Sequence, residues 1–248
     1  MSNFKSFKID TFKKYIDTLV VSRSVRRIQL HHTWSPAHAQ FKGNNHEALQ
    51  KGMQSYHIKT NGWNDIGQHF TIFPDGVIMT GRNIESIPAG IKGANASAIS
   101  IECIGNFDRG GDVMTEAQKQ AIVAVVKILL DKFGLSAKTA VTYHAWWTAS
   151  GTHLGTYVAG RSSKTCPGTN FFGGNTREAY EKNLLPLIEG YGKKMLETPN
   201  DITWELNHRH FPIKDTADFV KALEIAKNDP VLDNLYWGYY KLVNGIKN

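Results

Sequence analysis

The chain has 248 residues, of which 41% are hydrophobic, so it can bury the core of one large domain or of a medium domain with a smaller one. It contains no run of about 18 apolar residues, so neither a transmembrane helix nor membrane insertion is expected. Its two cysteines, Cys103 and Cys166, exclude a disulfide scaffold, although a single bridge between them stays open.

The formal net charge of +7 is concentrated at the amino terminus. Residues 1–27 contain seven Lys and Arg against two Asp, a net charge of +5. A basic segment suits an anionic partner such as nucleic acid, a membrane surface or a bacterial wall polymer, and a solvated amphipathic helix explains it equally well. The segment lacks the apolar stretch and small-residue cleavage site of a signal peptide, so we expect synthesis in the cytoplasm.

The first half of the chain shows both helix and strand patterns. Residues 7–19 predict a short helix, and residues 26–32 alternate apolar and polar side chains as a strand does. Residues 45–59 predict a second helix. The Pro-Asp-Gly turn at 74–76, with strand patterns on both sides, predicts a β-hairpin.

The second half continues the same mixture. Residues 98–105 form a nearly continuous apolar strand, which is typical of the middle of a sheet covered on both faces. Residues 115–133 predict the clearest helix, with a capping-box pattern at its start and a glycine stop at its end. Residues 137–147 predict a strand and residues 178–189 a helix. Strands mixed with covering helices give an α/β fold.

These patterns divide the chain into three parts. We expect an amino-terminal helical segment over residues 1–21, an α/β domain over 22–192 and, after a linker, a small helical region over 199–248. The aromatic stretch 232–242 suits either stacking on glycans or packing against the α/β domain or a second copy.

Cys166 stands in a polar stretch beside Lys164. A neighbouring cation favours the thiolate, the form that attacks carbon or binds metal, so Cys166 is a nucleophile, a metal ligand or an ordinary loop cysteine. His31 and His144 follow predicted strands. Two imidazoles and a thiolate are good zinc ligands that leave a fourth position for water. The spacing of these residues in the sequence does not by itself show whether they form a zinc site.

Five collinear segments carry a family resemblance: IQLHHTWSP, YHIKTNGWNDIGQHFTIFPDGVIMTGR, NASAISIE, YHAWW and KTCPG. Over roughly residues 26–172 the chain resembles the N-acetylmuramoyl-L-alanine amidases, the zinc enzymes of phage endolysins and autolysins whose fold peptidoglycan recognition proteins share. The resemblance implies a mixed central β-sheet flanked by helices. It also implies hydrolysis of the amide between N-acetylmuramic acid and L-alanine, with peptidoglycan as partner and no nucleic acid.

The resemblance also implies roles for single residues. His31, His144 and Cys166 would bind one zinc ion, and Lys164 would stabilise the oxyanion. Some family members use a tyrosine where this chain has Gln68, and others use a glutamate that matches Glu102, so the resemblance implies Glu102 as the general base. Trp63, Asn95 and Gln68 are expected to bind substrate.

Several alternatives remain open at this point. Residues 148–163 look like an inserted loop that could form a wall of the substrate groove, and His153 within it is an alternative second ligand. His32 is an alternative to His31, while His57 and His69 are read as packing or groove residues. A non-catalytic peptidoglycan-binding module and a cysteine hydrolase using Cys166 are the rival functions.

The absence of a signal peptide pattern fits a phage or prophage endolysin that is made in the cytoplasm of the host bacterium and acts on the cell wall after release. The oligomeric state does not follow from the sequence.

Overall fold

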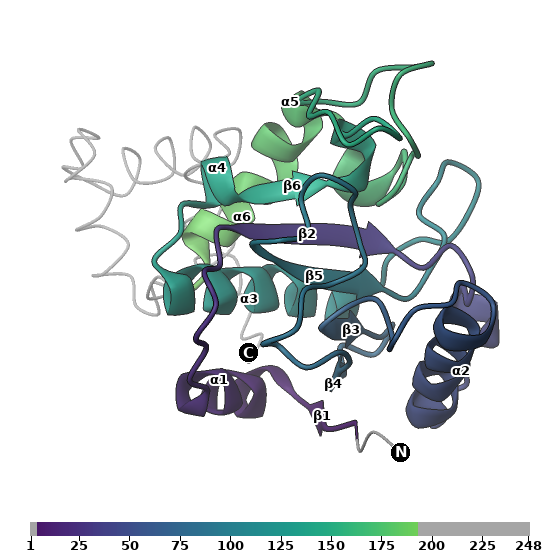
Figure 1. Cartoon of the computed structure of the whole chain (residues 1–248), viewed down its shortest axis with the longest axis vertical. Coiled ribbons are helices and arrows are strands. Elements are labelled where there is room, and N and C mark those ends of the chain that lie inside the picture. The colour runs from purple at the N-terminus through teal and green to yellow at the C-terminus, as the bar shows by residue number, and fades with distance from the viewer. Residues whose placement is uncertain (1–3, 193–248) are drawn as a thin grey trace, which may run out of the picture. The chain divides into compact units, whose positions relative to one another are not determined.

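A computed structural model describes residues 4–192 of the chain, which form a six-stranded sheet covered by helices (Figure 1). The strand order is β1-β4-β3-β5-β2-β6. β2 is parallel to β5 and β6, β3 is parallel to β5, and β4 is antiparallel to β1 and β3, so the predicted mixed sheet is confirmed. The strands are β1 (Ser6–Phe7), β2 (Arg27–His32), β3 (Phe70–Ile72), β4 (Ile78–Thr80), β5 (Ala98–Cys103) and β6 (Val141–Tyr143).

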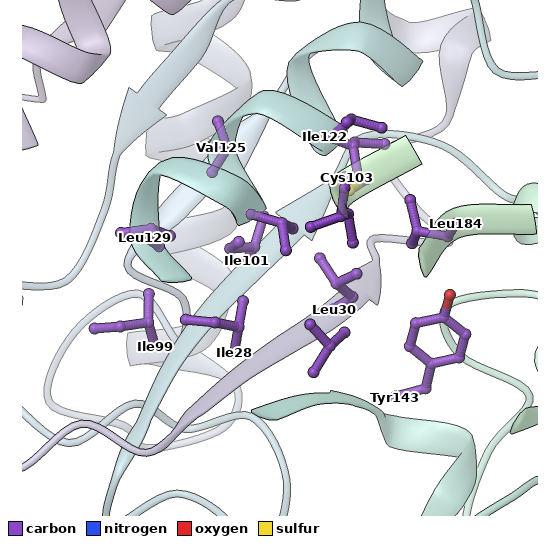
Figure 2. Packing of buried hydrophobic residues seen from close by; sticks show 14 of the residues in the cluster. Ile28, Leu30, Ile99, Ile101, Cys103, Ile122, Val125, Leu129, Tyr143 and Leu184 are labelled. Atoms are coloured by element: carbon purple, nitrogen blue, oxygen red, sulfur yellow. The ribbon is translucent and has the colours of Figure 1, made fainter. Parts of the chain in front are cut away.

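The central position of β5 follows from its composition. β5 lies between β2 and β3, and five of its six residues are buried. On one face of the sheet, Ile99 and Ile101 of β5 pack with Ile28 and Leu30 of β2 and with side chains of α3 (Glu116–Phe133) (Figure 2). Because side chains alternate along a strand, the residues between these isoleucines project toward the opposite face.

The predicted hairpin and the predicted long helix are both confirmed. β3 and β4 pair across the Pro-Asp-Gly turn, where Gly76 adopts a φ of 81° that favours glycine. Thr115 caps α3 by accepting a hydrogen bond from the Gln118 N–H at 3.0 Å, and Gly134 ends the helix with a φ of 63°.

The amino-terminal segment joins the same sheet and core. β1 pairs with β4, and Phe12 and Ile16 of α1 (Ile9–Thr18) are fully buried. The other expected helix of the first half is α2 (His46–Lys59). In Figure 1, α2 lies near the end of the sheet toward which β2 points.

One expectation needs correction and another is refined. Residues 137–147 are a strand only at β6, because the chain forms a helical turn, α4 (Ala137–Ala140), before it and a 3-10 turn, η2 (His144–Trp146), after it. Residues 178–189 are helical as expected, in three consecutive parts: α5 (Arg177–Ala179), the π-turn η4 (Tyr180–Leu184) and α6 (Leu185–Gly190). Pro186 has no N–H to donate, which interrupts the regular hydrogen-bond ladder here.

The remaining described elements are the short turns η1 (His38–Gln40) and η3 (Phe171–Gly173). Within residues 4–192, no helix combines the length and the hydropathy that crossing a bilayer requires. The predicted carboxy-terminal helices and nearly all of the predicted linker lie outside the described residues.

Candidate functional site

The polar side chains of the sheet meet in one lateral row. His31 on β2 is in register with Glu102 on β5, and Glu102 is in register with Thr71 on β3. β2 and β6 pair up to Leu30 and Tyr143, so His144, the next residue after β6, emerges beside His31. Residues in register project to the same face of a sheet, which explains why side chains distant in sequence gather here.

Three possible metal ligands converge at the end of this row. The candidate ligand atoms of His31, His144 and Cys166 all lie within 4.8 Å of one another. The two imidazole centroids are 5.2 Å apart, and His31 Nδ1 lies 3.5 Å from Cys166 Sγ. Tetrahedral zinc bonds of about 2.0–2.3 Å place neighbouring ligands roughly 3.5 Å apart, so the geometry fits a zinc ion.

The electrostatics of the three ligands also fit a cation. Burial, helped by neighbouring positive groups, lowers the pKa of His31 well below its usual value and that of His144 to about 4. Both imidazoles therefore keep a free lone pair at neutral pH. Burial raises the pKa of the Cys166 thiol, so the buried sulfur becomes a thiolate when a cation compensates its charge.

The loop that carries Cys166 is tethered by Asp108, whose carboxylate accepts hydrogen bonds from the Thr165 hydroxyl at 3.1 Å and from the Thr169 N–H at 2.9 Å. The Ala145 N–H donates to the Cys166 carbonyl at 2.7 Å, which ties this loop to the residue after His144. Sequence reasoning missed Asp108, because nothing near it in the chain marks it as a partner of residues 57 to 61 positions away.

The His31 ring is held in place through Nε2, the nitrogen that does not face Cys166. His31 Nε2 lies 3.4 Å from Gln29 Oε1, and the Gln29 amide donates to Asn95 Oδ1 at 3.3 Å. Asn95 Oδ1 also accepts from the N–H groups of Gly90 and Ile91. Asn95 is not among the residues that line the cavity described next, so its place does not support the expectation that it binds substrate. It holds a loop and, through Gln29, the ligand His31.

A cavity of about 980 Å³ opens over the ligand cluster. Glu102 and Lys164 both line it, together with the three ligands. Glu102 Oε2 is buried and has no hydrogen-bond partner among the described residues. Burial raises the pKa of Glu102 to about 8, although the Lys164 ammonium acts in the opposite direction. A carboxylate that is desolvated and unpartnered in a cavity is a candidate for proton transfer.

Two of the expected substrate-binding residues do line the cavity. Trp63 is half-buried and its ring lies 4.8 Å from that of His57. Gln68 is buried, and its amide donates to the Thr71 hydroxyl at 3.0 Å. Gln68 Oε1 is buried and has no hydrogen-bond partner in the described part of the chain.

The alternative ligands stand apart from the cluster. His32 Nδ1 accepts the Phe107 N–H at 3.0 Å, and although His32 lines the cavity it is not one of the three converging ligands. The His153 ring packs against that of Trp147, with the ring centroids 4.6 Å apart. His69 is buried, with Nδ1 accepting the Ser100 N–H, so it is a packing residue.

Two further readings are corrected. Among the described residues that line the cavity, none comes from 148–163, because this loop folds back through the Trp147–His153 bridge; it is not a wall of the groove. Cys103 and Cys166 are both free thiols, so the open possibility of a disulfide is closed.

Comparison with known proteins agrees with this geometry. The family model described as N-acetylmuramoyl-L-alanine amidase matches residues 21–169. The chain is 32% identical over 80 residues to the human N-acetylmuramoyl-L-alanine amidase and 33% identical over 78 residues to the endolysin of Escherichia phage T7. These matches cover 32% and 30% of this chain, and 14% and 52% of those proteins, which is less than two thirds of their length.

The Drosophila peptidoglycan recognition protein SA has a solved structure with a TM-score of 0.51 and 21% identity. The match covers 67% of this chain and 83% of that one, and it supports the fold alone. Since the family model spans more than half of the sequence and includes every element of the site, this chain belongs to the N-acetylmuramoyl-L-alanine amidase family.

Proposed function

We propose that the chain hydrolyses the amide bond between N-acetylmuramic acid and L-alanine in peptidoglycan, with one zinc ion held by His31, His144 and Cys166. The observation that carries the proposal is the convergence of three zinc-type ligands beside an unpartnered glutamate in one cavity. Membership of the amidase family supports the choice of substrate.

The three residues suit a catalytic rather than a structural zinc site. A structural site uses four protein ligands, whereas a catalytic site uses three and leaves one position open. A zinc ion in such a site supplies Lewis acidity, which polarises a carbonyl and lowers the pKa of water toward neutrality. The hydrogen bond from His31 to Gln29 would hold the imidazole with Nδ1 directed at the cluster.

Glu102 is proposed as the general base and acid. Its carboxylate would take a proton from the attacking water and return it to the leaving amine of L-alanine. The burial that raises the pKa of Glu102 makes the carboxyl a better proton acceptor, and positive charge at the cluster and on Lys164 would keep it ionised in the resting state. The amide of Gln68 cannot accept this proton.

Lys164 is proposed to stabilise the negative charge that develops on the carbonyl oxygen. It lines the cavity two residues before Cys166, so its ammonium stays close to the ligand cluster while its side chain remains exposed. Charge stabilisation of this kind contributes about 2.7–4 kcal/mol in comparable sites.

We further propose that the chain is a phage or prophage endolysin that is made in the host cytoplasm and reaches the cell wall after release. The support is the similarity to proteins described as endolysins, including that of phage T7. Peptidoglycan is then the partner, and nucleic acid is not.

The test is a digestion of purified cell walls with product analysis. The expected result is new amino termini on L-alanine without new reducing sugars, abolished by EDTA and restored by Zn²⁺. New reducing ends would instead identify a glycosidase. Activity that survives EDTA but is lost to a thiol-alkylating reagent would identify a cysteine hydrolase, and tight wall binding without any cleavage would identify a non-catalytic binding module.

A further inference from the structure

Two exposed aromatic side chains line the cavity and have no part in the proposed chemistry of the metal cluster. Trp34, directly after β2, is 63% exposed, and Tyr56 on α2 is 58% exposed. Neither belongs to the hydrophobic clusters of the described residues. Large apolar surfaces left open to water at the wall of a cavity are typical of binding sites.

The backbone at Trp34 adds a second observation. Trp34 has a φ of 57°, in the left-handed region that bulky residues rarely adopt. Two hydrogen bonds hold it there: the Trp34 N–H donates to the Gly105 carbonyl, and the Gly105 N–H donates to the Thr33 hydroxyl, both at 3.0 Å. The fold therefore maintains an unfavourable backbone conformation that displays an indole ring rather than burying it, which fits a binding role.

The wall beside Tyr56 leaves room for a ligand. Ala48, Gly52 and Tyr56 follow one another at intervals of four residues along α2, so they share one face of the helix, and all three line the cavity. A Cβ added at Gly52 would have no neighbouring atom within 4 Å. Small residues here leave open space next to the Tyr56 ring.

The distribution of charge indicates what occupies this space. From Thr33 to Trp63, the described residues that line the cavity include no Asp, Glu, Lys or Arg. The charged lining residues Glu102, Asp108 and Lys164 accompany the ligand cluster instead. A peptide stem carries carboxylates that need cationic partners, whereas a sugar ring is neutral and offers a face of C–H groups that stacks on aromatic rings.

We propose that Trp34 and Tyr56 form a stacking site for the sugar rings of the glycan strand, which places the glycan along α2 and the scissile amide at the ligand cluster. This inference rests on the proposed function, because it takes both parts of the cavity to hold one peptidoglycan molecule. It names the glycan, not the stem peptide, as what the aromatic wall binds.

The test uses the full chain and the neutral tetrasaccharide of N-acetylglucosamine, which has the N-acetylated rings of the glycan strand, no carboxylate and no amide that the proposed activity could cleave. Calorimetry should show that Trp34→Ala and Tyr56→Ala each weaken binding by about 2- to 13-fold, the loss expected for one stacked ring. Ile58→Ala is the matched control, because Ile58 is an exposed residue of the same helix that does not line the cavity. Its affinity should equal that of the unmodified chain.

Trp34→Gly tests whether misfolding, rather than loss of the indole ring, explains a loss of glycan affinity. Glycine accepts the left-handed conformation, so this variant should keep the thermal midpoint of the unmodified chain and still lose glycan affinity. Unchanged binding of the tetrasaccharide by Trp34→Gly and Tyr56→Ala would overturn the inference. So would a loss of affinity in these variants for a free stem peptide with no loss for the tetrasaccharide.

The two proposals fail in different ways. If walls are cleaved at L-alanine but the aromatic variants bind the tetrasaccharide normally, the stacking site is wrong and the amidase activity stands. If no cleavage occurs but tetrasaccharide binding depends on Trp34 and Tyr56, the stacking site stands and the proposed chemistry is wrong.

Discussion

His31 and Glu102 are paired in register across the parallel strands β2 and β5, so a candidate metal ligand and a candidate proton acceptor project from adjacent strands onto one face of the sheet. The site is therefore built on two inner strands of the sheet. Strand pairing fixes the two backbones, and the segments that follow β6 only have to deliver the remaining ligands, His144 and Cys166.

Glu102→Gln should reduce wall hydrolysis by about 10²- to 10⁴-fold, the usual contribution of a positioned general base. Glutamine keeps the volume of the side chain but cannot accept a proton at neutral pH. Zinc content should be unchanged, because the substitution leaves the three ligands in place. Release of L-alanine amino termini and metal analysis on the same samples provide the measurements.

The control for Glu102→Gln is Gln68→Ala, which removes a cavity-lining amide with no role in proton transfer and should cost far less turnover. Because Gln68 is buried, the thermal unfolding midpoint of Gln68→Ala is measured as well, so that a loss of stability is not mistaken for a loss of turnover. Near-normal turnover in Glu102→Gln would show that another group carries the proton.

Cys166→Ser should remove most of the bound zinc, because thiolate is the softest ligand of the set and a serine hydroxyl does not replace it. Cys103→Ala is the matched control: Cys103 is the other cysteine, fully buried in the core, and it is not one of the three converging ligands. That variant should lose some stability and keep one zinc per chain. Equal zinc content in Cys166→Ser and the unmodified chain would contradict the assignment.

Asp108→Ala should weaken zinc binding by about 10- to 100-fold without removing any ligand, since the carboxylate ties down both sides of the Cys166 loop. Asp108→Asn keeps one acceptor oxygen, so its zinc affinity should lie between that of Asp108→Ala and that of the unmodified chain. Competition with a chromogenic chelator measures the affinities. A zinc affinity in Asp108→Ala equal to that of the unmodified chain would show that the loop needs no tether.

Much of the fold could be predicted from the sequence because its signals are local. The alternation in residues 26–32, the apolar run of β5, the Pro-Asp-Gly turn and the capped helix α3 each follow from a few neighbouring residues. The helical turns on both sides of β6 and the π-turn within residues 178–189 were missed, because both depend on packing that no single motif encodes.

The candidate site divides in the same way. His31, His144, Cys166 and Glu102 stood out through the family resemblance, and the structure brings them together in one cavity. The tether from Asp108 and the support of His31 by Gln29 depend on contacts between distant segments, so they needed coordinates. Asn95 was expected to bind substrate, and its role in holding the loop at Gly90 and Ile91 likewise needed coordinates.

Gly90→Ala should damage both stability and zinc binding. A Cβ at Gly90 would collide with Gln29 Oε1 and would lie 3.1 Å from His31 Nε2, so the added methyl group would displace the pair that orients this ligand. Overpacking of this kind costs about 1–3 kcal/mol of unfolding free energy. Gly52→Ala is the opposite case, because its Cβ meets nothing within 4 Å and alanine favours the helix by roughly 0.5–1 kcal/mol. Urea unfolding should therefore shift in opposite directions for the two variants; the same direction for both would contradict the reading of the Gly90 contact.

The pH dependence of stability should carry a contribution from His69. Burial lowers the pKa of His69 to about 3, so the folded state resists protonation while the unfolded chain takes up a proton near the ordinary value of 6.5. The contribution is complete above pH 6.5 and is lost as the pH falls from 6.5 toward 3, by about 2 kcal/mol at pH 5. His69→Gln removes the titrating group but also the acceptor of the Ser100 N–H, so it should be less stable at pH 7. The decisive quantity is the slope: the difference in unfolding free energy between pH 7 and pH 5, measured by urea denaturation, should be about 2 kcal/mol smaller in His69→Gln than in the unmodified chain. An identical slope in both proteins would show that His69 does not titrate on unfolding.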